Sequence, residues 1–496
     1  MRSFPFASLS FAALLLACTA SKSDPLQVAD TGPLADTSPA DVSLDTADPE
    51  DVGPAAPPDW DRSVTPPTDD DATTKRASCT FKAGALPAES QGASRPMGKK
   101  IPIDHVVVIM QENRSFDHYF WKLKEAGHPD AEVAPPDFTN PDLTGKPVAP
   151  FHDSQLCFVD TAHGWNAVHT QYDDGKMDGF YKSNDHESPI PPHGTDAMVT
   201  GMRAMAYYDG ADLPFMYWAA DQFSIGDHYH CSILGPTWPN RMYLYAASSF
   251  GKTDNSPPDA SKALTIFDEL QMRRVTWKIY TSAVSPGFAM FVSQYLKFHD
   301  FHVFEADQYF EDAKNGTLPE VSFVDPVLGK EKFDQNDEHP PAMMQVGQAY
   351  LAKVTKALID SPLWPSSALF ITYDEHGGLW DHVVPPNACP PDALAPALGP
   401  SDAPGKFDRL GIRVPFVVVS PFAKKHFIGH HVYDHTSILR FIESRFTLPA
   451  LTARDANAEA PWEMFDFTAP RTDKPTVPDV PIDAAKLAAC KAIFVP

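Results

Sequence analysis

Positive charge is scarce in this 496-residue chain, which has 40 Lys and Arg residues against 65 Asp and Glu residues and a formal net charge of −25. Because a phosphate backbone attracts Lys and Arg, this balance excludes nucleic acid as a partner. After the N-terminal segment the sequence has no run of 18 apolar residues and no short-period repeat. The sequence therefore predicts neither a membrane-spanning helix in the body of the chain nor a repeat architecture.

Cysteine is also rare, with six residues in the whole chain. None of them shows the CxxC or Cys/His spacing of a zinc site, which excludes zinc-finger folds. Apart from Cys18, an exported chain of this kind can form at most two disulfides and leaves one thiol over. The pairing cannot be read from the sequence, and the five candidates are Cys79, Cys157, Cys231, Cys389 and Cys490.

The N-terminus has the pattern of an export signal. Arg2 precedes the apolar stretch "FPFASLSFAALLLA", which is too short to span a bilayer. This stretch ends in Leu15-Leu16-Ala17-Cys18, which resembles the lipobox of bacterial lipoproteins. We therefore expect a signal peptide over 1–18 and a lipid anchor on Cys18, which would hold the protein at a membrane facing the cell surface or the periplasm. The alternative is an ordinary signal peptide with an incidental Cys, which would give a secreted protein.

The segment 19–98 is rich in Asp, Pro, Ala and Thr and poor in aromatic residues. Such a segment buries too little apolar surface to offset the entropy of ordering, so we expect a disordered tether. The remaining segment, 99–496, carries most of the 32 Phe and 9 Trp residues and is expected to form the catalytic domain.

Strand and helix patterns alternate along this body. Short apolar runs predict strands at 103–110, 275–281, 321–325, 368–374 and 413–419. Helical patterns cover 341–360 and 437–446, the second after the N-cap candidates Asp434 and Thr436. The pattern indicates an α/β fold with a large, mostly parallel central sheet flanked by helices.

Polar residues follow two of the predicted strands directly. Glu112 and Asn113 come after "VVVIMQ", and Asp374 and Glu375 come after "ALFITY". Sites in open α/β sheets gather at the carboxyl ends of the strands, and hard divalent metals prefer oxygen ligands. We interpret these four residues as a metal site, although each carboxylate alone fits a capping or solvated role as well.

A third stretch, "GPTWPNR", places Thr237 after a Gly-Pro turn and before a helix expected to begin near Pro239. Free N–H groups at a helix start favour an anion, so the Thr237 hydroxyl is a candidate nucleophile. The local sequence by itself favours a plain N-cap instead.

Four stretches together resemble a bacterial phosphoesterase family that contains phosphatidylcholine-specific phospholipases C and a related acid phosphatase, a branch of the alkaline phosphatase superfamily. The likeness runs from Ile101 to Phe446, and the stretches are "QENRSFDHYF", "GPTWPNR", "NDEHPP" and "TYDEHGGLWDHVVPP". The resemblance implies an alkaline-phosphatase-like fold and one divalent metal ion. It implies the ligand and nucleophile set Glu112, Asn113, Thr237, Asp374 and Glu375.

Histidines complete the expected chemistry. The resemblance implies that His163 and His339 belong to the site, and it leaves the roles of His376, His382 and His435 open. We expect His339 or His382 to protonate the leaving oxygen after Thr237 attacks the phosphorus. Water would then hydrolyse a phosphothreonine intermediate.

The expected activity is that of a phospholipase C, which releases diacylglycerol from a glycerophospholipid. Two alternatives stay open: a phosphomonoesterase on the same scaffold and a binding lipoprotein without catalysis. The headgroup cannot be read, because the aromatic and acidic candidates favour core packing; they are Trp165, Trp218, Tyr243 and Asp178.

Overall fold

The computed structural model describes residues 58–185, 200–258, 264–281, 302–328 and 335–494. Contacts divide the chain into the units 1–47 and 48–496, and every described residue belongs to the second unit. The predicted signal peptide, Cys18 and the first part of the predicted tether lie outside the described residues.

A sheet of eight strands in the order β12-β6-β11-β10-β1-β9-β7-β8 forms the centre of this unit. Its strands are β1 (His105–Gln111), β6 (Ser224–Gly226), β7 (Trp277–Thr281), β8 (Val303–Glu305), β9 (Val321–Val324), β10 (Ser367–Tyr373), β11 (Phe416–Val419) and β12 (Phe427–Gly429). Most neighbouring strands are parallel, as predicted. β11 is an exception, because it pairs antiparallel with both β10 and β6.

β1 and β10 are the pair that positions the site. They run parallel and in step, from His105 opposite Ser367 to Gln111 opposite Tyr373. Their apolar side chains are buried on both faces of the sheet, which explains why both sequences lack the alternation of a half-exposed strand. Both strands therefore deliver the residues that follow them to the same edge.

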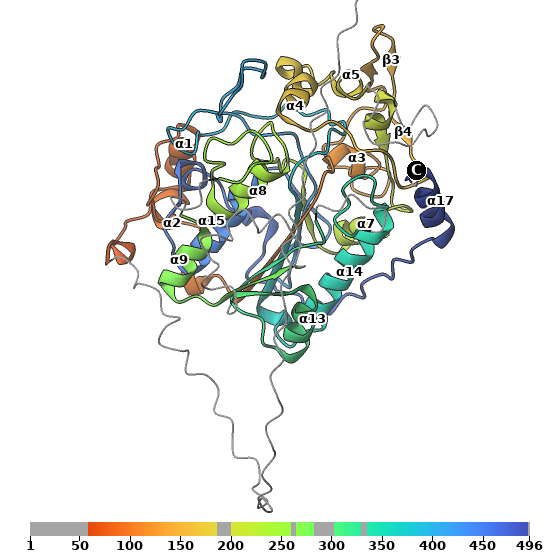
Figure 1. Cartoon of the computed structure of the whole chain (residues 1–496). Helices are drawn as coiled ribbons and strands as arrows, with labels where there is room; N and C mark the ends of the chain where they lie inside the picture. Colours follow the sequence, from red (N-terminus) through yellow and green to blue (C-terminus); the bar gives the residue numbers. More distant parts are fainter. Residues whose placement is uncertain (1–57, 186–199, 259–263, 282–301, 329–334, 495–496) are drawn as a thin grey trace, which may run out of the picture. The chain divides into compact units, whose positions relative to one another are not determined.

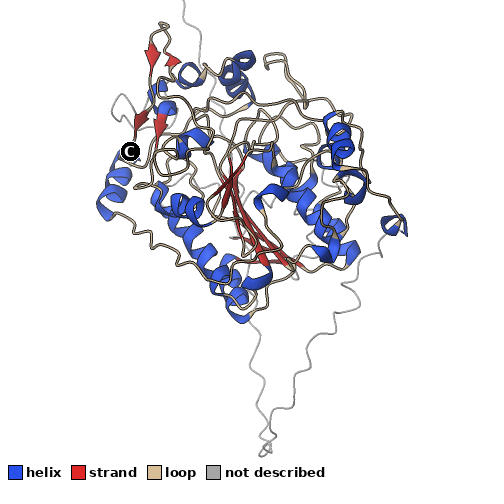
Figure 2. Cartoon of the chain, turned by 180° about the vertical axis from the view of Figure 1, so that it is seen from behind, coloured by secondary structure: helices blue, strands red, loops and turns tan. Residues whose placement is uncertain are grey.

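Helices cover both faces of the sheet. α8 (Thr237–Ala246), α9 (Ile266–Arg273) and α15 (His435–Phe446) lie on one side, and α7 (Pro214–Gln222), α13 (Ala306–Asn315) and α14 (Met344–Asp360) lie on the other (Figure 1). The same layers flank the sheet when it is seen from behind (Figure 2). The shorter elements are α3 (Phe116–Phe120), α4 (Trp165–Tyr172), α5 (Phe180–Asn184), α16 (Ala453–Ala456), and the small strand pairs β2 (Asn140–Pro141) with β3 (Pro147–Val148) and β4 (Phe151–His152) with β5 (Ala206–Tyr207).

The tether prediction is wrong for residues 58–98. This segment forms α1 (Asp69–Ala77) and α2 (Pro87–Ser90). The buried Arg76 guanidinium donates a hydrogen bond to the Ser90 carbonyl oxygen at 2.6 Å. A disulfide joins Cys79 to Cys389, so covalent and polar contacts order a segment that has few apolar residues.

A second disulfide joins Cys157 to Cys490 in α17 (Ala484–Phe494), and Cys231 is a buried free thiol. The expectation of two disulfides and one remaining thiol is thus confirmed. Such pairs are typical of proteins folded outside the reducing cytoplasm. Among the described residues no helix combines the length and apolarity that a membrane span requires.

Candidate active site

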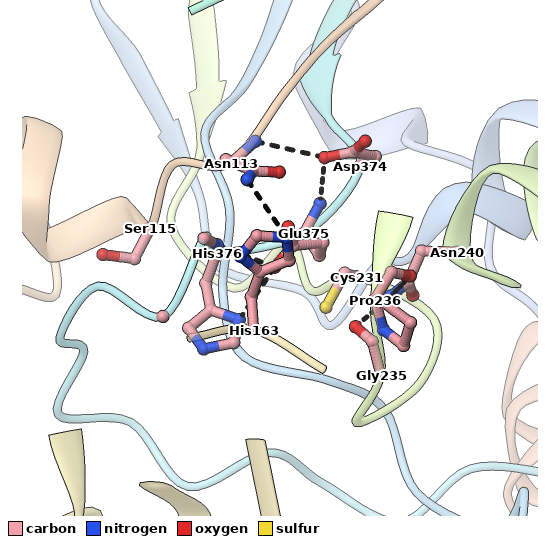
Figure 3. Close-up of polar contacts among 12 residues, drawn as sticks. Asn113, Ser115, His163, Cys231, Gly235, Pro236, Asn240, Asp374, Glu375 and His376 are labelled. Atoms are coloured by element: carbon pink, nitrogen blue, oxygen red, sulfur yellow. Dashed lines mark hydrogen bonds and ion pairs between the residues drawn. The ribbon is translucent and has the colours of Figure 1, made fainter. Parts of the chain in front are cut away.

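The carboxyl ends of β1 and β10 bring the predicted metal ligands together. The Asn113 backbone N–H donates to Asp374 Oδ1 at 3.2 Å, and the Arg114 N–H donates to the Glu375 carbonyl oxygen at 3.0 Å. Asn113 has a φ of 64°, a left-handed conformation that Asn tolerates better than most residues. Figure 3 shows Asn113, Asp374 and Glu375 facing one another, with His163 and His376 nearby.

Gly377 allows the chain to leave this cluster at a sharp angle. Its φ is +66°, and a Cβ atom there would lie 2.4 Å from the Asn113 carbonyl oxygen. Only glycine fits both the conformation and the space. The Gly377 N–H donates to Glu375 Oε2 at 2.7 Å, which orients that carboxylate.

Thr237 opens α8, and its hydroxyl does not cap the helix. The N-cap is Pro236, so the N-cap interpretation of Thr237 is wrong, and the helix begins two residues before Pro239. The Thr237 hydroxyl instead donates to Glu112 Oε1 at 3.3 Å, and the residue is 6% exposed. The candidate nucleophile is therefore held against a predicted metal ligand.

The backbone at the start of α8 offers fewer free N–H groups than expected. The Trp238 N–H donates to Asn255 Oδ1 at 2.9 Å, and Pro239 has no N–H. The Asn240 N–H points to the Pro236 carbonyl oxygen at 3.4 Å. The anion-binding capacity predicted for this helix start is thus largely used within the protein.

Two residues that the sequence reasoning missed position Thr237, the candidate nucleophile. The Asn240 side chain accepts from the Ile233 N–H at 3.0 Å and donates to the Gly235 carbonyl oxygen at 2.9 Å, which fixes the loop before Thr237 (Figure 3). Arg241 donates from Nε to Asp374 Oδ2 at 2.8 Å and from its terminal nitrogen to the Gln111 carbonyl oxygen at 2.9 Å. Their place in the "GPTWPNR" motif was the available signal.

Three oxygens of the cluster fit a cation. Glu112 Oε2, Asn113 Oδ1 and Glu375 Oε1 are buried and have no hydrogen-bond partner among the described residues. Unpaired buried oxygens are costly, and carboxylate and amide oxygens are the ligands of hard divalent metals. Asp374 differs, because Oδ1 accepts from two backbone N–H groups and Oδ2 accepts from Arg241.

The negative charges of the cluster also favour a bound cation. Burial raises the pKa of Glu375 well above its ordinary value, and the carboxylates of Asp374 and Glu112 add to this shift. Burial also raises the pKa of Asp374 to about 6, although Arg241 opposes it. A bound dication would offset this mutual repulsion.

His163 and His339 lie beside the cluster. Nε2 of His163 is 3.5 Å from the Asn113 amide nitrogen, and the two imidazole rings are edge to face with centroids 5.6 Å apart. Nδ1 of His163 faces the Thr161 carbonyl oxygen at 2.6 Å, and Nδ1 of His339 faces that of Pro340 at 2.5 Å. In each ring Nδ1 is therefore occupied by a backbone carbonyl oxygen, and Nε2 is the nitrogen on the opposite side of the ring from that contact.

Carboxylates surround this histidine pair. Asp160, His163 and His339 offer ligand atoms within 4.8 Å of one another. Burial lowers the pKa of His339, but the carboxylates of Asp160, Glu112 and Asp337 outweigh burial and leave the pKa above its ordinary value.

The three histidines left open by the sequence have different surroundings. His376 and His435 are buried, and burial holds the pKa of His376 well below its usual range and lowers that of His435 to about 4. Nε2 of His435 lies 2.8 Å from the Asp374 carbonyl oxygen, which indicates a supporting role. His382 pairs with Asp117 at 2.5 Å and with Glu132 at 3.2 Å, so both of its nitrogens are engaged by carboxylates.

The aromatic headgroup candidates pack in hydrophobic clusters. Trp165 and Tyr243 are buried in one cluster, and Trp218 packs against the main core. These contacts agree with the expected packing role.

Comparisons with known proteins place the chain in a family. The model of the Phosphoesterase family matches residues 103–449. The chain is 31% identical over 463 residues to a non-hemolytic phospholipase C of Burkholderia pseudomallei, covering 78% of this chain and 62% of the relative. It is 31% identical over 441 residues to phospholipase C B of Mycobacterium tuberculosis, covering 78% of this chain and 82% of the relative.

A solved protein of the alkaline phosphatase superfamily from Vibrio parahaemolyticus aligns over 86% of this chain and 95% of its own, with 11% identity and a TM-score of 0.34. The chain spans less than two thirds of the Burkholderia relative. By the extent of the family match and the identity to these phospholipases C, this chain belongs to the Phosphoesterase family.

Proposed function

We propose that this protein is a phosphodiesterase of the phospholipase C type, which cleaves a glycerophospholipid into diacylglycerol and a phosphorylated headgroup. The observation that carries the proposal is the Thr237 hydroxyl, held 3.3 Å from Glu112 beside three buried, unpaired oxygens. The phospholipases C among the relatives support a diester substrate.

Each residue has a role in this reaction. Glu112 Oε1 accepts the Thr237 hydrogen bond and orients Oγ1 for attack in line with the leaving oxygen. The Oγ1 proton passes to Glu112 Oε1, the Oγ1–phosphorus bond forms and the phosphorus–oxygen bond to diacylglycerol breaks, which leaves a phosphothreonine. Nε2 of His339, or of its neighbour His163, donates the proton to the leaving oxygen. In the second half the same nitrogen accepts a proton from the attacking water, whose oxygen bonds to phosphorus as the Oγ1–phosphorus bond breaks, and Glu112 returns its proton to Oγ1.

A divalent metal held by Glu112, Asn113, Asp374 and Glu375 would stabilise the negative charge that develops on the phosphoryl oxygens. Asn240 positions the nucleophile by holding the loop before Thr237. Arg241 acts indirectly, through its contact with Asp374. His382 is the alternative proton donor, and it would have to release Asp117 or Glu132 to act.

Two substrates compared on one metal-replete preparation test the proposal. We expect p-nitrophenyl phosphorylcholine to be cleaved faster than p-nitrophenyl phosphate, and Thr237→Ala to abolish both activities. Thr253→Ala is a matched control, because Thr253 is 7% exposed and its hydroxyl donates to the Ala397 carbonyl oxygen at 3.3 Å. Faster cleavage of the monoester would support the phosphomonoesterase alternative, and no cleavage of either ester would support the binding lipoprotein.

We also infer that Cys18 carries the lipid anchor expected from its lipobox-like sequence. In a bacterial host, Cys18→Ala should move the protein from the membrane fraction to the soluble fraction. An unchanged membrane fraction would refute the anchor.

A further inference from the structure

A cavity of about 640 Å³ lies between the segment 58–98, the start of α15 and the residues that follow α16. Arg76 and Arg95 of the segment line it, Glu459 lines it from the other side, and the Cys79–Cys389 disulfide forms part of its wall. Small-molecule sites have volumes of about 300–1,000 Å³. The cavity is therefore large enough for a ligand, and it shares no residue with the candidate active site.

Positive charge exceeds negative charge on the wall of this cavity, although the whole chain has a net charge of −25. The arginines of the wall are Arg76, Arg95 and Arg454, and its carboxylates are Asp434 and Glu459. Arg454 donates to three backbone carbonyl oxygens and lies 3.7 Å from Asp434, so this pair is used within the protein. Glu459 is then the carboxylate of the wall that faces the other two arginines.

Glu459 is shared by two arginines and a histidine. Its Oε2 lies 3.3 Å from Arg76 Nη2, and its Oε1 lies 3.2 Å from Arg95 Nη2 and 3.4 Å from His431 Nδ1. Charge-assisted hydrogen bonds of this kind are usually about 2.7–2.9 Å long. One carboxylate thus reaches none of its three partners at the usual distance.

The two arginines of the segment place two positive charges beside this one carboxylate. The Arg76 side chain is 7% exposed, and a buried guanidinium is costly unless its charge is compensated. Burial lowers the pKa of Arg76, and the Arg95 charge adds to this shift, whereas Glu459 opposes it. Among the described residues Arg95 has a side-chain partner only at Nη2, so its other N–H groups can serve a ligand.

We propose that this cavity binds a small molecule through an oxyanion, either a phosphate or a carboxylate group. A guanidinium group matches both anions with two parallel hydrogen bonds. The anion would supply the negative charge that Glu459 alone does not. The rest of the molecule would lie against Leu410 and Val432, and Val432 is an apolar side chain that is 46% exposed.

Modification of Arg95 by phenylglyoxal, followed by peptide mass spectrometry on the metal-loaded full chain, tests this cavity separately from the active site. Inorganic phosphate and acetate are titrated separately as probes. We expect protection of Arg95, and the probe that protects at the lower concentration identifies the class of anion. Arg62 is the matched control, because its side chain is 33% exposed, against 28% for Arg95, and it pairs with Glu89 at 2.6 Å outside the cavity. The probes should leave its rate of modification unchanged.

Two variants of the wall should shift the half-protecting concentration in opposite directions. Glu459→Gln removes the competing charge and should lower this concentration by about 5-fold, the effect of one unit charge at about 4 Å in water. His431→Ala removes a donor and should raise it by about 5-fold, the effect of one hydrogen bond. His431 is 48% exposed, so its replacement should not prevent folding.

The opposite signs separate an anion site from a structural disturbance, which would move both variants in the same direction. The proposal is overturned if neither probe protects Arg95, if Arg62 and Arg95 are protected equally, or if Glu459→Gln does not lower the half-protecting concentration. Each of these results would leave an ordinary network of ion pairs around Glu459.

Discussion

Arg241 is the residue whose replacement should reveal most about the active site. Its guanidinium and the Asp374 carboxylate are both fully buried and are joined at 2.8 Å. Arg241→Met would fill a similar space and leave Asp374 Oδ2 without its donor, while the Gln111 carbonyl oxygen would keep only the Asp374 N–H, at 3.2 Å. We expect this replacement to loosen the junction between α8 and the ends of β1 and β10.

The cost can be estimated from these contacts. Removing one partner of a buried ion pair destabilises a protein by about 3–5 kcal/mol, because the remaining charge is left without compensation. A divalent cation near Asp374 would replace part of the lost positive charge. The loss of stability should therefore be largest in protein treated with a chelator, and metal binding should be tighter in the variant than in the wild type.

Thermal unfolding with and without metal measures both effects. Arg440→Met is the matched control, because Arg440 and Glu443 form another fully buried pair at 2.6 Å outside the metal cluster. Its effect on Tm should not depend on metal. The reasoning would be refuted if Arg241→Met changed the Tm of the chelated protein by less than the Tm of the metal-loaded protein.

Three further outcomes are expected. Glu375→Gln should reduce retained divalent metal, measured by elemental analysis, by at least about 10-fold, because Glu375 Oε1 is one of the buried oxygens without a partner. Gly377→Ala should lower the Tm and the activity together, because its Cβ would meet the Asn113 carbonyl oxygen at 2.4 Å. His230→Gln should reduce the dependence of the free energy of unfolding on pH. Burial lowers the pKa of His230 to about 3 in the folded protein, so below about pH 6.5 the unfolded state binds a proton that the folded state does not. Wild-type stability therefore falls as the pH drops from about 6.5.

Each outcome has a control. Glu269→Gln should keep the metal, because burial raises the pKa of Glu269 well above its ordinary value and the neutral acid resembles Gln. Gly145→Ala should cost less than Gly377→Ala, since Gly145 also has a positive φ of +86° but no atom lies within 4 Å of its added Cβ. If the free energy of unfolding changed with pH equally in the wild type and in His230→Gln between pH 6.5 and 4, the role assigned to His230 would be contradicted.

The ends of two strands could be predicted because their signals are local. The apolar runs stop at Met110 and Tyr373, and the polar residues that follow have no place in a buried strand. The parallel register of β1 and β10 then brings Glu112 and Asp374 together, as the α/β pattern indicated. The four-motif resemblance added Thr237 and the two site histidines.

Other features depend on contacts that no local pattern reveals. β6, β8 and β12 have three residues each, too few for a periodic signal, and the antiparallel course of β11 is set by its neighbours. Arg241 looks like an ordinary polar helix residue until Asp374, more than 100 positions away, lies beside it. The segment 58–98 is ordered through Cys79 and paired side chains such as Arg62 with Glu89, which composition alone does not show.

The two disulfides overlap along the chain, because Cys157 lies inside the loop closed by Cys79 and Cys389 and Cys490 lies outside it. A single backbone cut anywhere between Cys79 and Cys490 therefore leaves two pieces that are still linked by sulfur. Such a protein would migrate as one band on a non-reducing gel after one cleavage and as two bands after reduction. This interlocking gives the chain a tolerance to nicking that noncovalent packing alone would not provide.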